Sequence, residues 1–171
     1  MKKVLCFVIV LSSVHFMTQA QEKSTYKSAI GLRIGDGYYD LASLSFKTFL
    51  GSPLALEANI GFRDYGIIGY NWFNLSGSLS LQYHVKISAV PGLQWFVGGG
   101  ATAFNTFSSY SYYRGFGLGV FPTAGADYKF SKIPLDVSAD IRPTIGIIKP
   151  YAYYDDFYLA NVGVSARYTF K

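Results

Sequence analysis

The sequence predicts an all-β protein, an eight-stranded antiparallel up-and-down transmembrane β-barrel, from three observations. Residues 73–86 read F-N-L-S-G-S-L-S-L-Q-Y-H-V-K, in which apolar and polar residues alternate. Side chains of a strand point to opposite faces in turn, so this stretch has one apolar and one polar face. It is also long enough for a tilted strand to cross a bilayer. Finally, no part of residues 21–171 is apolar enough for a transmembrane helix, so a membrane-spanning chain has to close a barrel.

Eight stretches carry this alternation. The first sets isoleucine and leucine against alanine, glycine and arginine, and the second sets leucine and phenylalanine against serine and lysine. The third is regular throughout, the fourth is the stretch quoted above, and the fifth is rich in glycine. In the last three, aliphatic and aromatic residues alternate with glycine, serine, threonine and charged residues. The predicted strands are 26–35, 40–50, 53–63, 73–86, 92–104, 115–130, 135–146 and 160–170.

Connections between these stretches differ in length. Short turns rich in Gly, Ser or Pro are predicted at 51–52, 88–91 and 131–134, and longer tyrosine-rich loops at 64–72, 105–114 and 147–156. Only the connection at 36–39 breaks this alternation. Short periplasmic turns and longer extracellular loops are typical of outer-membrane barrels.

Two prolines fall inside predicted strands. Pro122 lies in the sixth and Pro143 in the seventh. Proline cannot donate to the hydrogen-bond ladder, and a closed barrel has no edge strand to accommodate it, so we expect a local bulge at each.

The composition of the two faces distinguishes a membrane barrel from a soluble barrel with an apolar lumen. A water-exposed face should be dense in charged residues, whereas here the polar face is mostly Ser, Gly, Asn, Thr and Ala. Such small residues suit the narrow lumen of an eight-stranded barrel. Aromatic residues should form a girdle at each membrane interface. The predicted girdles are Tyr65, Tyr70, Trp72 and Phe73 on the loop side, and Phe46, Phe49, Tyr83, Trp95, Tyr128, Phe130, Tyr168 and Phe170 on the turn side.

Residues 1–20 are predicted to be a signal peptide, with Lys2 and Lys3 before an apolar run and Thr18-Gln19-Ala20 as the cleavage site. Residues 21–171 then form one outer-membrane β-barrel domain. They contain no cysteine, so disulfides and thiol chemistry are not expected. Lys and Arg occur singly, which argues against nucleic acid as a partner.

With these features the chain resembles the small eight-stranded outer-membrane barrels, the group that contains the OmpA transmembrane domain and OmpX. The resemblance rests on the signal peptide, the strand count, the alternation of turns and loops, and the aromatic last strand from Val162 to Phe170. It implies a place in the cell outer membrane of a Gram-negative bacterium and recognition of the last strand by the barrel-assembly machinery. Lys171 departs from the family pattern, in which an aromatic residue ends the chain.

Charged residues of both signs fall on the predicted lumen face. In a narrow lumen such charges have to pair, because an unpaired buried charge is costly. We expect Asp140 or Glu57 to pair with Arg142, Arg167 or Arg33, which would plug the barrel; the alternative is a narrow polar path for ions or water. The predicted lumen charge network is Arg33, Lys47, Glu57, Arg63, Asp127, Lys129, Asp136, Asp140, Arg142 and Arg167.

Enzymatic activity is not expected. Some barrels of this size modify lipid A with a His-Ser-acid arrangement, but residues 21–171 contain one histidine, His84, with no acid near it in sequence. One histidine and no cysteine also make a metal site unexpected, and no cofactor is predicted.

Tyrosines are concentrated in the predicted loops. Tyrosine offers a large rigid contact area with a polar group, which suits adhesion or contact with glycan and lipopolysaccharide, and also anchoring at headgroup level. The predicted contact residues are Tyr110, Tyr112, Tyr113, Tyr151, Tyr153 and Tyr154. We therefore expect a monomeric outer-membrane protein with a structural or surface-interaction role. The alternatives are a small porin or hydrophobic-solute channel, and a lipid-modifying enzyme.

Overall fold

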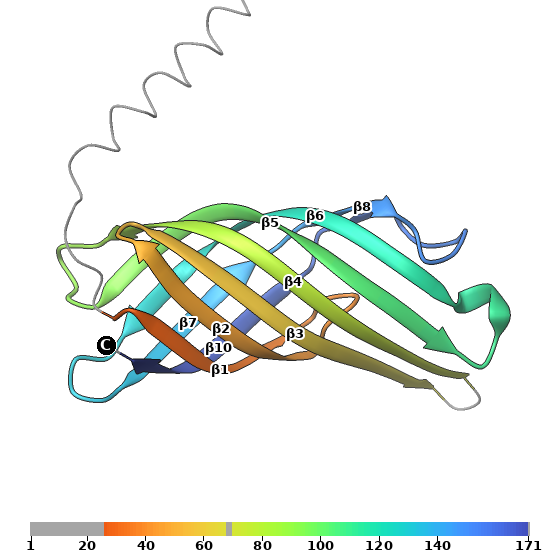
Figure 1. Ribbon diagram of the computed structural model, residues 1–171, viewed down its shortest axis with the longest axis horizontal. Coiled ribbons are helices and arrows are strands. Elements are labelled where there is room, and N and C mark those ends of the chain that lie inside the picture. The colour runs from red at the N-terminus through yellow and green to blue at the C-terminus, as the bar shows by residue number, and fades with distance from the viewer. Residues whose placement is uncertain (1–25, 68–69, 171) are drawn as a thin grey trace, which may run out of the picture.

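The computed structural model describes residues 26–67 and 70–170, which form a closed antiparallel β-barrel (Figure 1). The strands are β1 (Ser28–Gly35), β2 (Ala42–Gly51), β3 (Leu54–Ile67), β4 (Tyr70–Lys86), β5 (Leu93–Ser108), β6 (Gly115–Lys129), β7 (Leu135–Ile141), β8 (Thr144–Ile148), β9 (Phe157–Tyr158) and β10 (Val162–Phe170). The predicted signal peptide and its cleavage site near Ala20 lie outside the described residues. Across residues 26–67 and 70–170, no helix has the length and apolar character needed to span a membrane.

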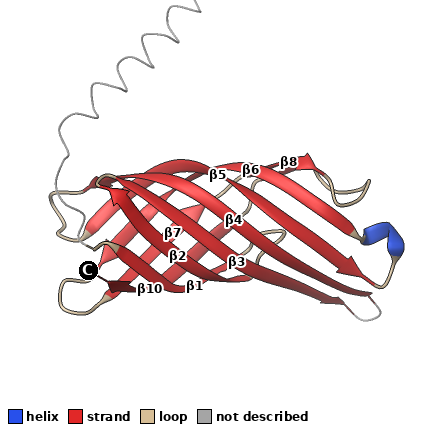
Figure 2. Ribbon diagram, viewed as in Figure 1, coloured by secondary structure: helices blue, strands red, loops and turns tan. Residues whose placement is uncertain are grey.

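The barrel closes because β1 pairs with β2 on one side and with β10 on the other. The strand β6 pairs with both β7 and β8, which together form the seventh strand of the wall. The strand β9 pairs with β8 and precedes β10, so these two form the eighth. The predicted eight-stranded up-and-down barrel is therefore confirmed. Figure 2 shows that strands make up nearly all of the wall, and that the short 3-10 helix η2 (Ser111–Tyr113) lies in the loop after β5.

The apolar side chains face outward. In β10, Val162, Val164, Tyr168 and Phe170 are each 45–56% exposed, while the residues between them are buried. The same alternation runs through the other strands, and the buried positions of the described chain are mostly Ser, Thr, Asn and charged residues. The structure therefore excludes a soluble barrel with an apolar lumen, and it gives the barrel the orientation that a lipid surround requires.

The wall is longer on one side than on the other. The strands β3 to β6 have 14–17 residues each, whereas β1, β2 and β10 have 8–10. The predicted loop at 64–72 is wrong for this reason, since β3 and β4 stay paired through Asp64↔Phe73 to Ile67↔Tyr70. The long hairpins extend beyond the rest of the barrel at the end away from the C-terminus (Figure 1).

The prediction of a bulge at each proline is wrong for Pro122, whereas a register shift of one residue does lie at Pro143. Pro122 pairs with Gly99 in an unbroken register between β5 and β6. On its other side, β6 pairs with β7 up to Ala124↔Ile141 and with β8 from Val120↔Ile145, in the same register. Pro122 and Pro143 therefore lie opposite each other in a gap of the ladder, and on this side the register shifts further along, between Leu118 and Gly119. On the other side of Pro143 the register shifts at the proline itself, because residues 142–143 lie opposite residues 159–161. Because neither proline has an N–H group, one gap accommodates both.

Three aromatic residues assigned to the girdles face the interior side instead. Phe49 is buried against Tyr26, with ring centroids 5.2 Å apart, at the point where the register between β2 and β3 shifts. Tyr65 and Trp72 are register partners on the lumen-facing side of β3 and β4. Phe73 does face outward, and the other outward aromatic residues near it are Phe62, Phe107 and Phe116.

Candidate functional site: the lumen charges and the tyrosine cap

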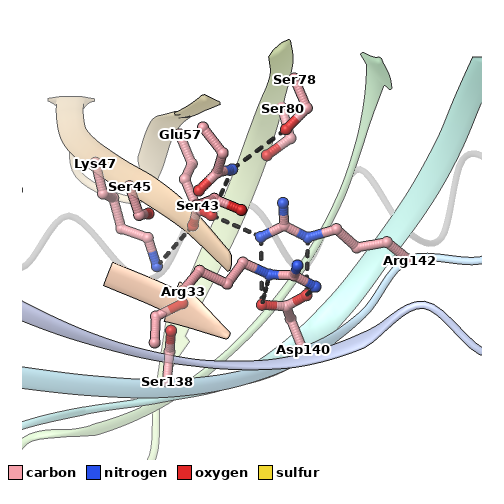
Figure 3. A network of polar contacts seen from close by, with 12 residues as sticks. Arg33, Ser43, Ser45, Lys47, Glu57, Ser78, Ser80, Ser138, Asp140 and Arg142 are labelled. Atoms are coloured by element: carbon pink, nitrogen blue, oxygen red, sulfur yellow. Dashed lines mark hydrogen bonds and ion pairs between the residues drawn. The ribbon is translucent and has the colours of Figure 1, made fainter. Parts of the chain in front are cut away.

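Charged side chains from most of the wall meet inside the barrel. We call them the lumen network: Arg33, Asp40, Lys47, Glu57, Asp127, Asp136, Asp140, Arg142 and Arg167, all at most 6% exposed. Each of these residues lies on the inward face of its strand or just beyond a strand end, where period-two alternation directs its side chain to the axis. Figure 3 shows the central part of the network, with Arg33, Asp140, Arg142, Glu57 and Lys47 converging from different strands.

Glu57 connects three cations across the lumen. Its Oε1 lies 2.6 Å from Arg142 Nη2, and its Oε2 lies 3.0 Å from Arg167 Nη2 and 3.4 Å from Lys47 Nζ. Gln82 also donates to Oε2 at 3.1 Å. With both oxygens in charge-assisted contacts, this carboxylate is held by strands on several sides of the barrel, and its contacts are of the strong kind.

Asp140 joins Arg33 to Arg142 toward the loop end. Its Oδ1 accepts from Arg33 Nη2 and from Arg142 Nε, each at 2.8 Å. Arg33 also donates to Asp40 at 3.1 Å and to Asn161 at 3.2 Å, so all of its contacts lie within the barrel. Toward the turn end, Lys47 donates to Asp127 at 2.8 Å and Arg167 to Asp136 at 3.4 Å.

Glycines in the wall make room for the Arg33 side chain. A Cβ atom on Gly163 would lie 2.4 Å from the guanidinium carbon of Arg33, and one on Gly35 would lie 2.8 Å from its Nη1. Both positions therefore need the absence of a side chain, because the guanidinium lies flat against β1 and β10. Phe104 lies against Gly117 in the same way, with 2.3 Å between the ring and a built Cβ atom.

The structure brings together eight of the ten residues predicted for the lumen charges and places two elsewhere. Arg63 lies at the loop end, 18% exposed, with its Nη1 2.8 Å from Asp36. Lys129 lies at the turn end, where its Nζ donates to the carbonyl oxygens of Ile133, at 2.8 Å, and Phe130. Sequence reasoning missed Asp40, because the predicted strand 40–50 gave it the outward direction of Leu44 and Phe46, whereas in the structure it lies in the connection between β1 and β2.

Aromatic side chains pack against one another at the loop end of the barrel. We call them the tyrosine cap: Tyr38, Tyr39, Phe104, Tyr151 and Tyr154. Tyr39 stacks on Phe104 with ring centroids 5.4 Å apart, and Tyr154 contacts Phe104 at 5.5 Å and Tyr38 at 4.6 Å. The Tyr39 hydroxyl lies 3.1 Å from Thr144 Oγ1 and accepts from Asn161 at 2.8 Å, which joins the cap to the network.

The cap holds its phenols in the neutral form. Burial raises the pKa of Tyr39 to about 12, with a further contribution from the Asp40 carboxylate. Burial likewise raises the pKa of Tyr154, and burial together with the hydrogen bond to Tyr151 raises the pKa of Tyr38. A phenol removed from water resists ionisation because its charged form loses solvation.

The six predicted contact tyrosines fall into two groups. Tyr112 and Tyr153 are each 81% exposed and Tyr110 is 47% exposed. Tyr151 and Tyr154 belong to the cap, where Tyr154 is only 7% exposed. Tyr113 stacks on Trp72 with centroids 5.0 Å apart. Only the first three are therefore available as an exposed surface.

His84 is buried near the turn end. Its Nε2 lies 3.2 Å from Gln82 Oε1, and its ring lies 5.0 Å from both Phe49 and Phe96. Its Nδ1 has no hydrogen-bond partner. These neighbours are an amide and two phenyl rings, which do not form the base and orienting acid of a nucleophilic triad. Within residues 26–67 and 70–170, no three His, Cys or acidic residues are grouped closely enough to hold a metal ion.

Comparison with known proteins gives a structural likeness. No protein-family model matches this sequence, and no curated protein matches it. Among solved structures, the chain is similar to the crystal structure of Neisserial surface protein A (NspA), with a TM-score of 0.61 over 87% of this chain and 99% of that one. The sequences are 12% identical over that match. The chain thus has the fold of the small eight-stranded outer-membrane barrels.

Proposed function

We propose that this chain is an integral outer-membrane β-barrel protein with a plugged lumen and a structural or surface-interaction role. The observation that carries the proposal is the inverted distribution of side chains, in which aliphatic and aromatic groups lie outside and nine paired charges lie inside. In water this arrangement would expose a belt of apolar surface around the barrel, whereas in a bilayer that belt contacts acyl chains. The fold shared with NspA supports the same location.

The lumen network and the cap together support the proposal of a plugged lumen. The network crosses the axis through Glu57 and Asp140, with contacts of 2.6–3.4 Å. Above it, the cap fills the loop end with aromatic rings. An ion moving along the axis would have to break several charge-assisted contacts at once, and the small-porin alternative therefore has no support from the geometry.

Conductance across a planar bilayer tests the plug. We expect the reconstituted protein to give no stepwise current. We expect the double variant Glu57→Ala/Arg142→Ala, which removes two large side chains from the axis, to conduct if it folds. Heat-dependent mobility on a gel reports folding for both proteins. Steady channel openings in the unchanged protein would instead favour the channel function.

We propose that the surface role belongs to Tyr110, Tyr112 and Tyr153, with lipopolysaccharide as the partner. These phenols project from the loop end, where a barrel in the outer membrane meets the lipopolysaccharide layer, and tyrosine combines a rigid apolar ring with a hydroxyl that can bind sugar. The tyrosines of the cap are excluded because they are packed against one another.

Vesicle binding tests this contact surface. Proteoliposomes should co-sediment with vesicles that contain purified lipopolysaccharide, and the triple variant Tyr110→Ser/Tyr112→Ser/Tyr153→Ser should lose most of this binding. The matched control is Ser88→Ala on the turn side, which is exposed and distant from the loops. Equal binding by the triple variant and the unchanged protein would show that these tyrosines are not the contact surface.

Delivery to the outer membrane involves two further proposals. Cleavage near Ala20 releases residues 21–171, and the barrel-assembly machinery recognises the last strand, in which outward residues end in Tyr168 and Phe170. The barrel closes on itself through the pairing of β1 with β10, so it needs no second copy, and we propose a monomer. We propose no enzymatic activity.

A further inference from the structure

We propose that the lumen network holds one proton at neutral pH, shared between the carboxyl groups of Asp127 and Asp136. The inference goes beyond the structural role proposed above and starts from a count of charges. Among the described residues, the buried cations are Arg33, Lys47, Arg142 and Arg167, and the buried acids are Asp40, Glu57, Asp127, Asp136 and Asp140. Five carboxylates against four cations would leave one net negative charge sealed from water, and a buried unbalanced charge is neutralised by proton uptake where it can be.

The geometry locates the proton at the turn end of the network. Asp127 pairs with Ser138 and Lys129 pairs with Asp136, so the two aspartates are diagonal neighbours on the inward faces of β6 and β7. Their side chains lie within hydrogen-bonding reach of each other. They are 1% and 0% exposed. Two ionised carboxylates held this close in a dry site repel each other strongly, and one shared proton converts the repulsion into a hydrogen bond.

The remaining contacts of the two aspartates support this assignment. Asp127 Oδ2 accepts from Lys47 Nζ at 2.8 Å and from the Tyr26 hydroxyl at 3.4 Å, and Asp136 Oδ2 accepts from Arg167 at 3.4 Å. The other oxygen of each carboxyl, Oδ1, has no donor from any described group. A proton is the missing donor for this pair. The groups that face the pair from the surrounding elements are Tyr26, which precedes β1, Lys47 of β2, His84 of β4, Lys129 of β6, which is the register partner of Asp136, and Arg167 of β10. Glu57 of β3 is joined to the pair through its own contacts with Lys47 and Arg167.

Two other groups could carry the proton, but in each of them an atom that would be protonated has no hydrogen-bond acceptor. His84 would balance the count as an imidazolium, but its Nδ1 has no hydrogen-bond partner and its ring lies between two phenyl rings. Asp40 accepts from Arg33 and Ser43 through Oδ2, and its Oδ1 has no partner. The Asp127–Asp136 pair is the one place in the described lumen where two carboxyl groups can share a proton directly.

Infrared spectroscopy of the full barrel in lipid tests the proposal. A protonated carboxyl has a carbonyl stretching band separate from that of a carboxylate. We expect the unchanged protein at neutral pH to show one such carboxyl per chain, with a band that shifts after long exchange into D₂O. In Asp136→Asn the amide replaces the shared proton as donor to Asp127, and the band should disappear while the barrel remains folded.

Matched variants separate this site from its competitors. Asp40→Glu and His84→Gln leave the number of buried acids unchanged, and both should keep the band at its position. Absence of the band from the unchanged protein would overturn the proposal and indicate that the His84 imidazolium or a cation other than a proton balances the lumen. A shift of the band in Asp40→Glu, or its persistence in Asp136→Asn, would also overturn it. The spectrum of the unchanged protein decides the first point even if a variant fails to fold, and Asp127→Asn gives a second test of the pair.

Discussion

The lumen network and the tyrosine cap lie in the same barrel and are held together by different kinds of contact. The network is built from charges on strands that are far apart in sequence, and its contacts are short, from 2.6 to 3.4 Å. The cap is built mainly from loop residues, whose ring centroids lie 4.6–5.8 Å apart. Charge pairing needs directions that a rigid wall can set, whereas ring packing tolerates the less regular backbone of a loop. The network should therefore affect the stability of the whole barrel, and the cap mainly that of the loop end.

The largest effect is expected from Glu57→Gln, which leaves three buried cations without their shared carboxylate. Breaking a buried charge pair from one side typically costs about 3–5 kcal/mol, and we expect at least that loss in the free energy of unfolding, measured with urea in lipid vesicles. The control is Arg63→Gln, whose partner Asp36 is 65% exposed, so that only about 0–1 kcal/mol should be lost. Equal losses in both variants would contradict a distinct role for the network.

A smaller effect is expected from Gly163→Ala, which tests how the wall positions the network. The added Cβ atom would meet the guanidinium group of Arg33 and displace it from Asp140, and overpacking of this kind typically costs about 1–3 kcal/mol. In Gly77→Ala, the control, the new Cβ atom has no atom within 4 Å. The same urea measurement applies, and a stable Gly163→Ala protein would show that Arg33 has room to move.

Alkaline pH should weaken the cap. The pKa of Tyr39 is raised to about 12 by burial, and those of Tyr38 and Tyr154 are raised as well. Their contribution to stability is complete below about pH 10, where tyrosine of an unfolded chain ionises, and it is lost as the pH rises through the higher folded values. Limited proteolysis of residues 149–156, followed together with tyrosinate absorbance, should show the loop opening above about pH 10 before the barrel unfolds. If the loop remained protected until the barrel unfolded, the cap would not be a separate unit.

The smallest effect is expected from Tyr112→Ser. The side chain is 81% exposed, and surface substitutions of this kind usually change the free energy of unfolding by less than about 0.5 kcal/mol. The midpoint of thermal unfolding in detergent should therefore match that of the unchanged protein, whereas Tyr154→Ser should lower the temperature at which the loop end becomes accessible to protease. A large loss of stability in Tyr112→Ser would place this residue in the packed group.

The part of this structure that the sequence predicts is the part that alternation controls. Once a strand is identified, the alternation of side chains decides whether a residue faces lipid or lumen, and this places Glu57, Asp140 and Arg167 inside. Alternation gives no information beyond the end of a strand or across a change in register. Asp40 and Tyr39 lie in a connection, and Phe49 lies at a register shift, so their positions depend on tertiary contacts.

The extent of a strand is also set by its neighbours. Tyr65 and Trp72 lie where the sequence predicts a loop, but in the structure they are register partners that extend the pairing of β3 with β4. Lys129 and Arg63 alternate in step with the lumen-facing residues of their strands. They lie at the two ends of the barrel, however, and pair there with backbone carbonyl groups or with an exposed acid.

The position of Pro122 opposite Pro143 has a consequence for how the wall can open. On the turn side of this gap, β7 is joined to β6 by six residue pairs and to β10 by seven. On the loop side, β8 is joined to β6 by three pairs and to β9 by two. The strands β8 and β9 are therefore held by fewer residue pairs than β7. We expect β8 to separate from β6 at the proline gap while β7 stays paired.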